Sequence, residues 1–349
     1  MKLFAGVVLV LSFTLPGWGQ GRYVIADQDA STTADMALML LLQSPEVRLL
    51  GITVITGNSW RDEEVAHALR LVEALGKTDV PVLAGAAFPL VRTAEETRLF
   101  DQLYGKPSFL GAYTAPSAPV GWDKVDPAVL PEGPPKIRAG DENAAQFMVR
   151  MVHAHPHQVT IVALGPLTNV ALACRLDPHF AELVQELVLM GGSLNPQTDA
   201  AEWVNRPRHE FNFWFDPEAT SITLHEKWAK VTTTTIDVSL KTRTEPEVLD
   251  GLAKAHSPAA QWVTRYTTRP VFPNYLWDEL AVAAWIDPTL IRSERVVYMD
   301  VATDHGAAYG ETLVYTDADK PGLVPSQVHA ITDVDLPRLQ GMIVKRLSK

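Results

Sequence analysis

The sequence predicts one α/β domain with a mostly parallel central β-sheet flanked by helices, in a Rossmann-like arrangement. Short runs of apolar and β-branched residues alternate with longer segments in which apolar residues recur at helical spacing. The strand candidates are almost continuously apolar, which is typical of parallel strands that helices cover on both faces. With 47% hydrophobic and 20% charged residues, the chain can bury a large core. No repeat or linker divides the sequence, so we expect a single domain.

Individual elements follow from local patterns. Strands are expected where Val, Ile and Thr gather between turn residues, and helices where apolar residues recur three or four apart. The predicted strands are residues 23–26, 51–56, 80–84, 159–163, 186–190, 230–234 and 296–301. The predicted helices are residues 35–43, 63–75, 143–154, 169–175, 178–183, 217–225 and 277–286. Segments 104–135 and 195–208 are long and irregular in composition, so we expect lids or loops that line a site.

The N-terminus has the pattern of a secretory signal peptide. Lys2 precedes an apolar run over residues 3–15, and Gly17 and Gly19 have the spacing of a cleavage site before Gln20. The run is short for a membrane span, although an uncleaved anchor is the alternative. We expect a signal peptide over residues 1–19 and a mature domain over residues 20–349. The protein would then be exported, to the periplasm or the extracellular space, with no membrane contact after signal removal.

Charge and cysteine content narrow the classes of function. The formal net charge is −11 and no cluster of Lys and Arg appears, which argues against a nucleic-acid partner. The single cysteine, Cys174, lies in an apolar helical pattern, where a buried thiol is expected rather than a nucleophile.

Oxygen-bearing side chains follow several predicted strands. Asp27 and Asp29 end the first strand, Asp35 begins the next helix, and later strand ends or helix starts supply Asn58, Thr168, Glu210, Asn212 and Asp278. Ligands of parallel sheets bind at the carboxyl ends of the strands. Alone, Asp35 or Asp278 is as readily a helix cap. Together the set suits either a hard cation such as Ca²⁺ or a polyhydroxylated ligand, and zinc is disfavoured because His and Cys do not cluster.

The order and spacing of eight motifs resemble the inosine-uridine-preferring type of nucleoside hydrolase. The motifs are "DQD…D", "GITVITGN", "VPVLAGAAFPL", "VTIVALGPLTNVALA", "LVLMGGS", "EFNFWFDPEA", "TTIDVS" and "LWDELAVAAWIDP". They span most of the mature chain and are collinear with the family pattern. The resemblance implies the nucleoside hydrolase fold and hydrolysis of the N-glycosidic bond of ribonucleosides to ribose and free base. It also implies a small-molecule nucleoside partner and allows a homo-oligomer.

The resemblance assigns roles to individual residues. Asp29 matches the metal-bound general base, and Asp278 and the Thr168 carbonyl match further Ca²⁺ ligands, so Asp29 and Asp278 are the catalytic candidates. Asp35 matches the acid that binds the ribose hydroxyls. The other substrate-binding candidates are Asn58, Met190, Glu210, Asn212 and Trp277. Trp277 stands where purine-preferring members stack a Trp on the base, which favours purine nucleosides. His67 and His209 are two candidates for the proton donor to the leaving base, and the sequence does not distinguish between them.

One stretch departs from the family pattern. The usual opening is Asp-x-Asp-x-Gly-x-Asp-Asp, whereas this chain has Ser31 at the Gly position and a loop one residue longer. Alignment on the helix places Met36 where the second acid, a calcium ligand, is expected. Either Asp35 takes over as a metal ligand, or the metal site is weakened or lost.

Two alternatives follow from these observations. A non-catalytic protein that binds a nucleoside or sugar would retain the fold without the metal. A haloacid-dehalogenase-type phosphatase would use Asp27 as nucleophile and Asp29 as acid, since "VIADQDAS" also fits the short motif of that class.

Overall fold

The computed structural model describes residues 21–30, 32, 34–114, 120–244, 246–267, 275–323 and 325–349. The predicted signal peptide lies outside these residues, so cleavage and export stay predictions. Within the described residues, no helix combines the length and apolar character needed to cross a bilayer.

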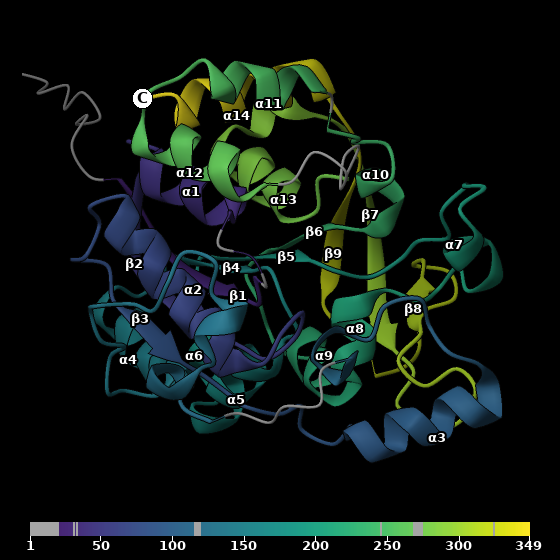
Figure 1. Ribbon diagram of the computed structural model, residues 1–349. Helices are drawn as coiled ribbons and strands as arrows, with labels where there is room; N and C mark the ends of the chain where they lie inside the picture. Colours follow the sequence, from purple (N-terminus) through teal and green to yellow (C-terminus); the bar gives the residue numbers. More distant parts are fainter. Residues whose placement is uncertain are drawn as a thin grey trace, which may run out of the picture.

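The described residues form one nine-stranded sheet in the order β3-β2-β1-β4-β5-β6-β9-β7-β8 (Figure 1). The strands are β1 Arg22–Gln28, β2 Val47–Val54, β3 Val82–Ala84, β4 Val159–Ala163, β5 Glu186–Met190, β6 Val231–Thr234, β7 Ile291–Val301, β8 Thr312–Tyr315 and β9 Gln327–Val334. The strands from β3 to β9 in this order pair in parallel, and β7 is antiparallel to both of its neighbours. The predicted single α/β domain with a mostly parallel sheet is confirmed.

Helices cover both faces of the sheet. The α-helices of the described residues, which include some that do not cover the sheet, are α1 Met36–Gln43, α2 Arg61–Ala74, α3 Ala94–Tyr104, α4 Ala144–Ala154, α5 Thr168–Leu176, α6 Phe180–Leu183, α7 Ala201–Asn205, α8 Phe211–Phe215, α9 Pro217–Leu224, α10 Ile236–Ser239, α11 Pro246–Ala253, α12 Pro258–Tyr266, α13 Asp278–Ile286 and α14 Leu336–Leu347. One core lies under α1 and α11–α14, and a second lies under α4, α5, α6 and α9, on opposite sides of the sheet (Figure 1).

The seven predicted strands and seven predicted helices all exist, with ends that differ by a few residues. Seven further helices and strands β8 and β9 were not predicted. Strand β9 alternates apolar with polar residues, and α8 is a five-residue aromatic segment, so neither carries the continuous pattern that marked the other elements. The short helix α7 lies within segment 195–208, which was predicted to be irregular.

The position of β1 determines where a ligand can bind. Its neighbours in the sheet are β2 on one side and β4 on the other, so the chain leaves β1 in one direction and returns on the opposite side. At such a switch point the loops after the two central strands separate and leave room for a ligand. Asp27 and Asp29 lie at the carboxyl end of β1, where this separation occurs.

Candidate active site

Asp29, in the loop directly after β1, is tightly enclosed. Its side chain is 1% exposed, its Oδ2 accepts a hydrogen bond from the Asn58 backbone at 3.0 Å, and its Oδ1 accepts one from Asn58 Nδ2 at 3.2 Å. A Cβ added to Gly57 would lie 2.0 Å from Asp29 Oδ2, and one added to Gly165 would lie 2.8 Å from Asp29 Cβ. The two glycines therefore form a cradle that fixes this carboxylate. Asn58 was predicted to contact ribose; here it orients Asp29, and a ribose contact stays a prediction.

Asp27 faces the interior of the molecule. Its side chain is fully buried, and its Oδ1 accepts hydrogen bonds from the Thr53 hydroxyl at 2.7 Å and from Asn169 Nδ2 at 2.8 Å. Asn169 Oδ1 in turn accepts from the Ala86 backbone at 2.8 Å. Burial raises the pKa of Asp27 to about 7, against the opposing effect of these hydrogen bonds. Asp27 thus links β1 to β2 and α5, which is a structural role.

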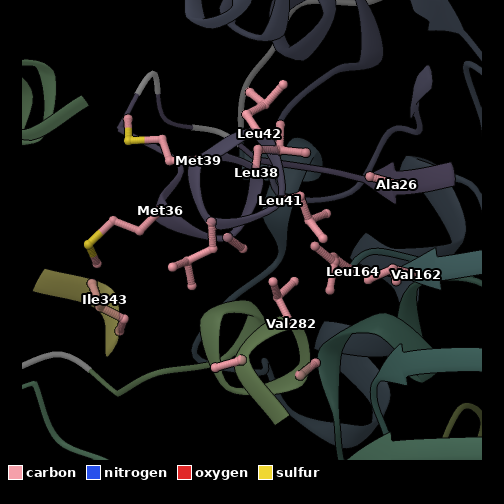
Figure 2. Close-up of a cluster of buried hydrophobic side chains, with 14 of the residues drawn as sticks. Ala26, Met36, Leu38, Met39, Leu41, Leu42, Val162, Leu164, Val282 and Ile343 are labelled. Carbon is pink, nitrogen blue, oxygen red and sulfur yellow. The ribbon is translucent and has the colours of Figure 1, made fainter. Parts of the chain in front are cut away.

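The structure shows where Asp35 and Met36, which depart from the family pattern, lie at the start of α1. Asp35 is the N-cap of α1, and its Oδ1 accepts from the Leu38 backbone at 2.9 Å. Met36, the first helical residue, is 7% exposed and belongs to the core that includes Ile343 of α14 (Figure 2). Met36 is therefore a packing residue. Asp35 is thus engaged as a helix cap, and its role as a metal ligand stays a prediction.

Asp35 belongs to a group of carboxylates that influence one another. Asp278 and Glu279 begin α13 and are partly buried, as is Asp35. Burial is the main cause that raises the pKa of Asp29 and of Asp278 well above the usual range, and their neighbours raise each further. These neighbours are Glu210, Asp27 and Asp35 for Asp29, and Asp29, Glu279, Asp35 and Glu210 for Asp278. We call Asp29, Asp35, Glu210, Asp278 and Glu279 the acidic cluster.

Glu64 is a further acid that the sequence did not indicate. It lies on α2, is fully buried, and its Oε1 accepts from the Ser59 backbone at 2.7 Å. Its Oε2 has no hydrogen-bond partner among the described residues. Burial, and then the charge of Asp29, raise its pKa well above the usual range. Glu64 therefore supports the Gly57–Ser59 turn that orients Asp29. In the sequence it is one of three consecutive acids at a helix start, which is an ordinary pattern.

Glu210 and Asn212 lie at the start of α8, next to the end of β5. Glu210 Oε2 accepts from the backbones of Gly192 and Phe213, each at 3.0 Å, and its Oε1 accepts from Asn212 at 2.9 Å. Burial nevertheless raises its pKa to about 7. Asn212 Nδ2 donates to the Met190 carbonyl at 3.0 Å and approaches the Met190 sulfur at 3.4 Å. The structure thus brings Met190, Glu210 and Asn212 together, as the predicted ribose-binding set requires.

Trp277 lies among other aromatic side chains. Its ring centroid is 6.0 Å from that of Trp203 on α7 and 5.6 Å from that of Tyr275, and all three residues are partly buried. We call these three residues the aromatic rim. Trp277 immediately precedes Asp278, so the rim adjoins the acidic cluster. The sequence did not indicate Trp203, because its neighbours in segment 195–208 are polar.

Thr168 begins α5, directly after the Gly165–Pro166 turn that packs on Asp29. Its hydroxyl donates to Asp216 Oδ2 at 2.6 Å. Asp216 also caps α9 through its Oδ1, with Pro217 in the first helical turn. The Thr168 hydroxyl is thus engaged, and coordination by the Thr168 carbonyl stays a prediction.

The two histidines have opposite character. Burial opposes a charge on His67, but hydrogen bonds to Glu132, at 2.5 Å, and to Glu63 outweigh it and raise the pKa to about 9. Burial lowers the pKa of His209 to about 3, helped by Arg206 and Arg92. His67 is therefore held as a cation by Glu132, and His209 is neutral. His209 packs against Trp214 rather than among the acids of the cluster.

The acidic cluster has the donor chemistry of a hard-cation site. As the described side chains stand, no three His, Cys, Asp or Glu residues are placed to hold a metal ion together. The donors are nevertheless carboxylate oxygens, which Ca²⁺ prefers. Their mutual elevation of pKa shows that ionising them together is unfavourable unless a positive charge joins them. Asp29, Asp35 and Asp278, from three different elements, would hold such a cation.

Fold and site together define a class of protein: an α/β enzyme whose acidic cluster lies at the switch point of a parallel sheet, beside an aromatic rim. A model of the inosine-uridine preferring nucleoside hydrolases matches residues 24–341. The chain belongs to this family, and its relatives are enzymes that act on N-glycosyl compounds. Because the chain belongs to this family, the alternative of a haloacid-dehalogenase-type phosphatase is set aside.

Individual relatives cover nearly the whole chain. A probable uridine nucleosidase 2 from Arabidopsis thaliana is 29% identical over 94% of this chain and 98% of its own length. An inosine-uridine preferring nucleoside hydrolase from Leishmania major is 28% identical over 90% of this chain and 94% of its own. Among solved structures, a purine-preferring ribonucleoside hydrolase from Gardnerella vaginalis is 25% identical, with a TM-score of 0.70 over 94% of this chain and 98% of its own.

Proposed function

We propose that the protein hydrolyses the N-glycosidic bond of ribonucleosides and that Asp29 is the general base. The observation that carries the proposal is the environment of Asp29. Asn58 holds both of its oxygens, Gly57 and Gly165 enclose it, and the carboxylates of Glu210, Asp27 and Asp35 lie within electrostatic range of it. A carboxylate fixed at the switch point of the sheet, with a raised pKa, is suited to take a proton from water.

The reaction uses the residues as follows. Asp29 accepts a proton from water, the water oxygen forms a bond to C1′ of the ribose, and the C1′–N bond breaks with its electron pair leaving on the base. The leaving base takes up a proton, and Asp29 later releases its own to solvent. The transition state carries positive charge on the sugar, which Glu210 and Asp278 stabilise electrostatically. Direct attack by water inverts the anomeric centre.

The proposed cofactor is Ca²⁺. Asp29, Asp35, Asp278 and the Thr168 carbonyl would hold it, and when bound it would lower the pKa of water and align the ribose diol. The support is the oxygen chemistry of these donors and their position on separate elements around one carboxylate.

We propose purine nucleosides as the favoured substrates. Trp277 and Trp203 offer aromatic faces next to Asp278, and a purine presents more surface for stacking than a pyrimidine does. The relatives include a probable uridine nucleosidase, an inosine-uridine preferring hydrolase and a purine-preferring hydrolase, so the proposed choice of substrate depends on the aromatic rim of this chain.

A direct assay tests the proposal. Purified protein is incubated with inosine, guanosine, adenosine or uridine, after EDTA and then with added Ca²⁺, and free ribose is measured. We expect ribose release that EDTA abolishes and Ca²⁺ restores. Nucleoside-dependent thermal stabilisation without ribose release at any Ca²⁺ concentration would instead establish the non-catalytic binding alternative.

Export and assembly are separate proposals. The pattern of residues 1–19 supports export, and N-terminal sequencing of the mature protein from cell fractions tests it: a protein that begins at Met1 in the cytosol refutes export. The family resemblance supports a homo-oligomer, which light scattering during gel filtration tests.

A further inference from the structure

A second pocket lies between α3, α8 and the segment that precedes β8, apart from the acidic cluster. In Figure 1, α3 lies below β8, outside the helices that cover the sheet. The pocket has about 400 Å³ of unfilled space including its open mouth. Its lining is aromatic and charged of both signs, with Phe100 and Tyr104 from α3, Trp214 from α8, and Arg92 and Arg206 as the basic residues.

Arg92 is the unusual residue of this pocket. It is only 2% exposed, and its guanidinium lies between two rings, 4.5 Å from the Trp214 centroid and 4.3 Å from the Tyr309 centroid. Its Nε and Nη2 have no hydrogen-bond partner among the described residues. These two nitrogens form one edge of the guanidinium, the edge that binds a carboxylate or phosphate through two parallel hydrogen bonds. Burying a charged donor without an acceptor is unfavourable, so this edge favours an acceptor supplied from outside the chain.

The carboxylates near Arg92 are engaged with other groups. Glu96 accepts from His305 at 2.5 Å, and both oxygens of Glu218 accept from the Tyr309 hydroxyl, at 2.9 and 3.0 Å. Both acids lie within electrostatic range of Arg92, but within the described residues neither accepts a hydrogen bond from its guanidinium. The two acids thus reduce the cost of the buried charge, and the described residues give the enclosed Nε–Nη2 edge no acceptor.

Gly310 and His209 lie near Arg92. Gly310, at φ +87°, has no side chain where a Cβ would lie 3.3 Å from Arg92 Nη2. His209 lines the same pocket, and burial together with Arg206 and Arg92 lowers its pKa to about 3, so its neutral ring can donate a hydrogen bond without carrying charge. Asp101 and Glu311 also line the pocket, which favours a compact anion over a polyanion.

We propose that this pocket binds a compact oxyanion, a phosphate or carboxylate group, on the Nε–Nη2 edge of Arg92. The two oxygens accept the two unused hydrogen bonds, and the rings of Trp214 and Tyr309 keep the guanidinium flat and correctly oriented. The site is distinct from the acidic cluster. His209 and Glu210 are adjacent in sequence, and only Glu210 belongs to that cluster.

The first test measures binding. Inorganic phosphate, or acetate in a parallel experiment, is titrated into the full-length protein at constant ionic strength, with calorimetry as the readout. We expect saturable binding that weakens at least tenfold in Arg92→Met, which removes the guanidinium and keeps an unbranched side chain at this position. Arg98→Met is the matched control, because Arg98 is an exposed residue of α3 that pairs with Glu95. Equal binding by Arg92→Met and wild type, or no saturable binding, overturns the proposal.

The second test locates the anion without a variant. A wild-type crystal soaked in sodium selenate should show an anomalous selenium peak within hydrogen-bond distance of Arg92 Nε and Nη2. Selenium only elsewhere, or no peak at all, overturns the proposal. This result holds even if Arg92→Met fails to fold. Phosphate rather than acetate as the tighter ligand identifies a phosphoryl group as the natural occupant, and the reverse identifies a carboxylate.

Discussion

The acidic cluster and the aromatic rim are adjacent but are built in different ways. Asp29, at the centre of the cluster, has both oxygens hydrogen bonded and glycines packed on two sides. Trp203, Tyr275 and Trp277 of the rim are partly exposed, and Trp203 comes from a short helix inside an irregular segment. The proposed site of bond cleavage thus lies in a closely packed part of the molecule, and the proposed surface for the base lies in a partly exposed part.

The largest expected effect is at Asp29. Asp29→Asn keeps the shape and the cradle but removes the proton acceptor, so kcat should fall about a thousandfold or more. Initial rates of ribose release measure the effect, and circular dichroism checks the fold. Activity within tenfold of wild type would show that another group is the base.

The next effect tests whether the cluster is as rigid as its packing indicates. In Gly57→Ala the new Cβ would lie 2.0 Å from Asp29 Oδ2, so the carboxylate must move. We expect kcat to fall about a hundredfold, because a displacement of about 1 Å in a reacting group costs that much. Gly341→Ala, on the exposed side of α14 where a Cβ meets nothing within 4 Å, is the control and should leave kcat unchanged.

Cation binding should depend strongly on pH. Burial and neighbouring carboxylates raise the pKa values of Asp29 and Asp278, so these acids keep their protons to higher pH than usual, and a cation competes with those protons. Ca²⁺ binding should therefore release protons, and the affinity should increase about tenfold or more from pH 6 to pH 8. Calorimetry in buffers of different ionisation enthalpy measures the release. An affinity independent of pH would show that the acids are already ionised.

Substitutions of Glu64 should have a smaller effect on kcat, and they distinguish the role of its charge from the role of its hydrogen bond. Glu64→Gln keeps an oxygen for the Ser59 backbone and should retain kcat within about twofold, whereas Glu64→Ala leaves that N–H buried without a partner and should lower kcat about tenfold. The pH profile of kcat is the second readout, and it should be unchanged in Glu64→Gln. A large loss in Glu64→Gln would mean that the charge of Glu64 takes part.

The smallest effect is expected at the rim. Trp203→Ala should raise KM for inosine about threefold to tenfold and KM for uridine less, with kcat little changed, because one stacking face is lost. Val204→Ala, at the exposed neighbouring position, serves as the control. Equal changes in KM for both substrates would show that Trp203 only supports the fold of segment 195–208.

The sequence predicted the central strands well because β1, β4 and β5 are buried on both faces, which requires continuous apolar runs. It also predicted that acids at separate strand ends would meet, because parallel strands share one carboxyl edge. It did not predict Glu64 or Trp203. Burial of Glu64 depends on how α2 packs behind the Gly57–Ser59 turn, and the position of Trp203 depends on a tertiary contact with Trp277. Neither contact produces a periodic pattern in the sequence from which it could be predicted.

The placement of Met36 has a consequence for how sequences of such proteins are compared. Within a helix, successive side chains are about 100° apart around the axis, so neighbouring positions face different surroundings. Asp35 caps the first turn of α1, whereas Met36, the next residue, packs in the core beside Ile343. An exchange of an acid for an apolar residue at this position therefore changes the core under α1 as well as the edge of the sheet. For relatives with unusual loop lengths, the direction of a side chain has to be known before a difference at an aligned position is counted as the loss of a ligand.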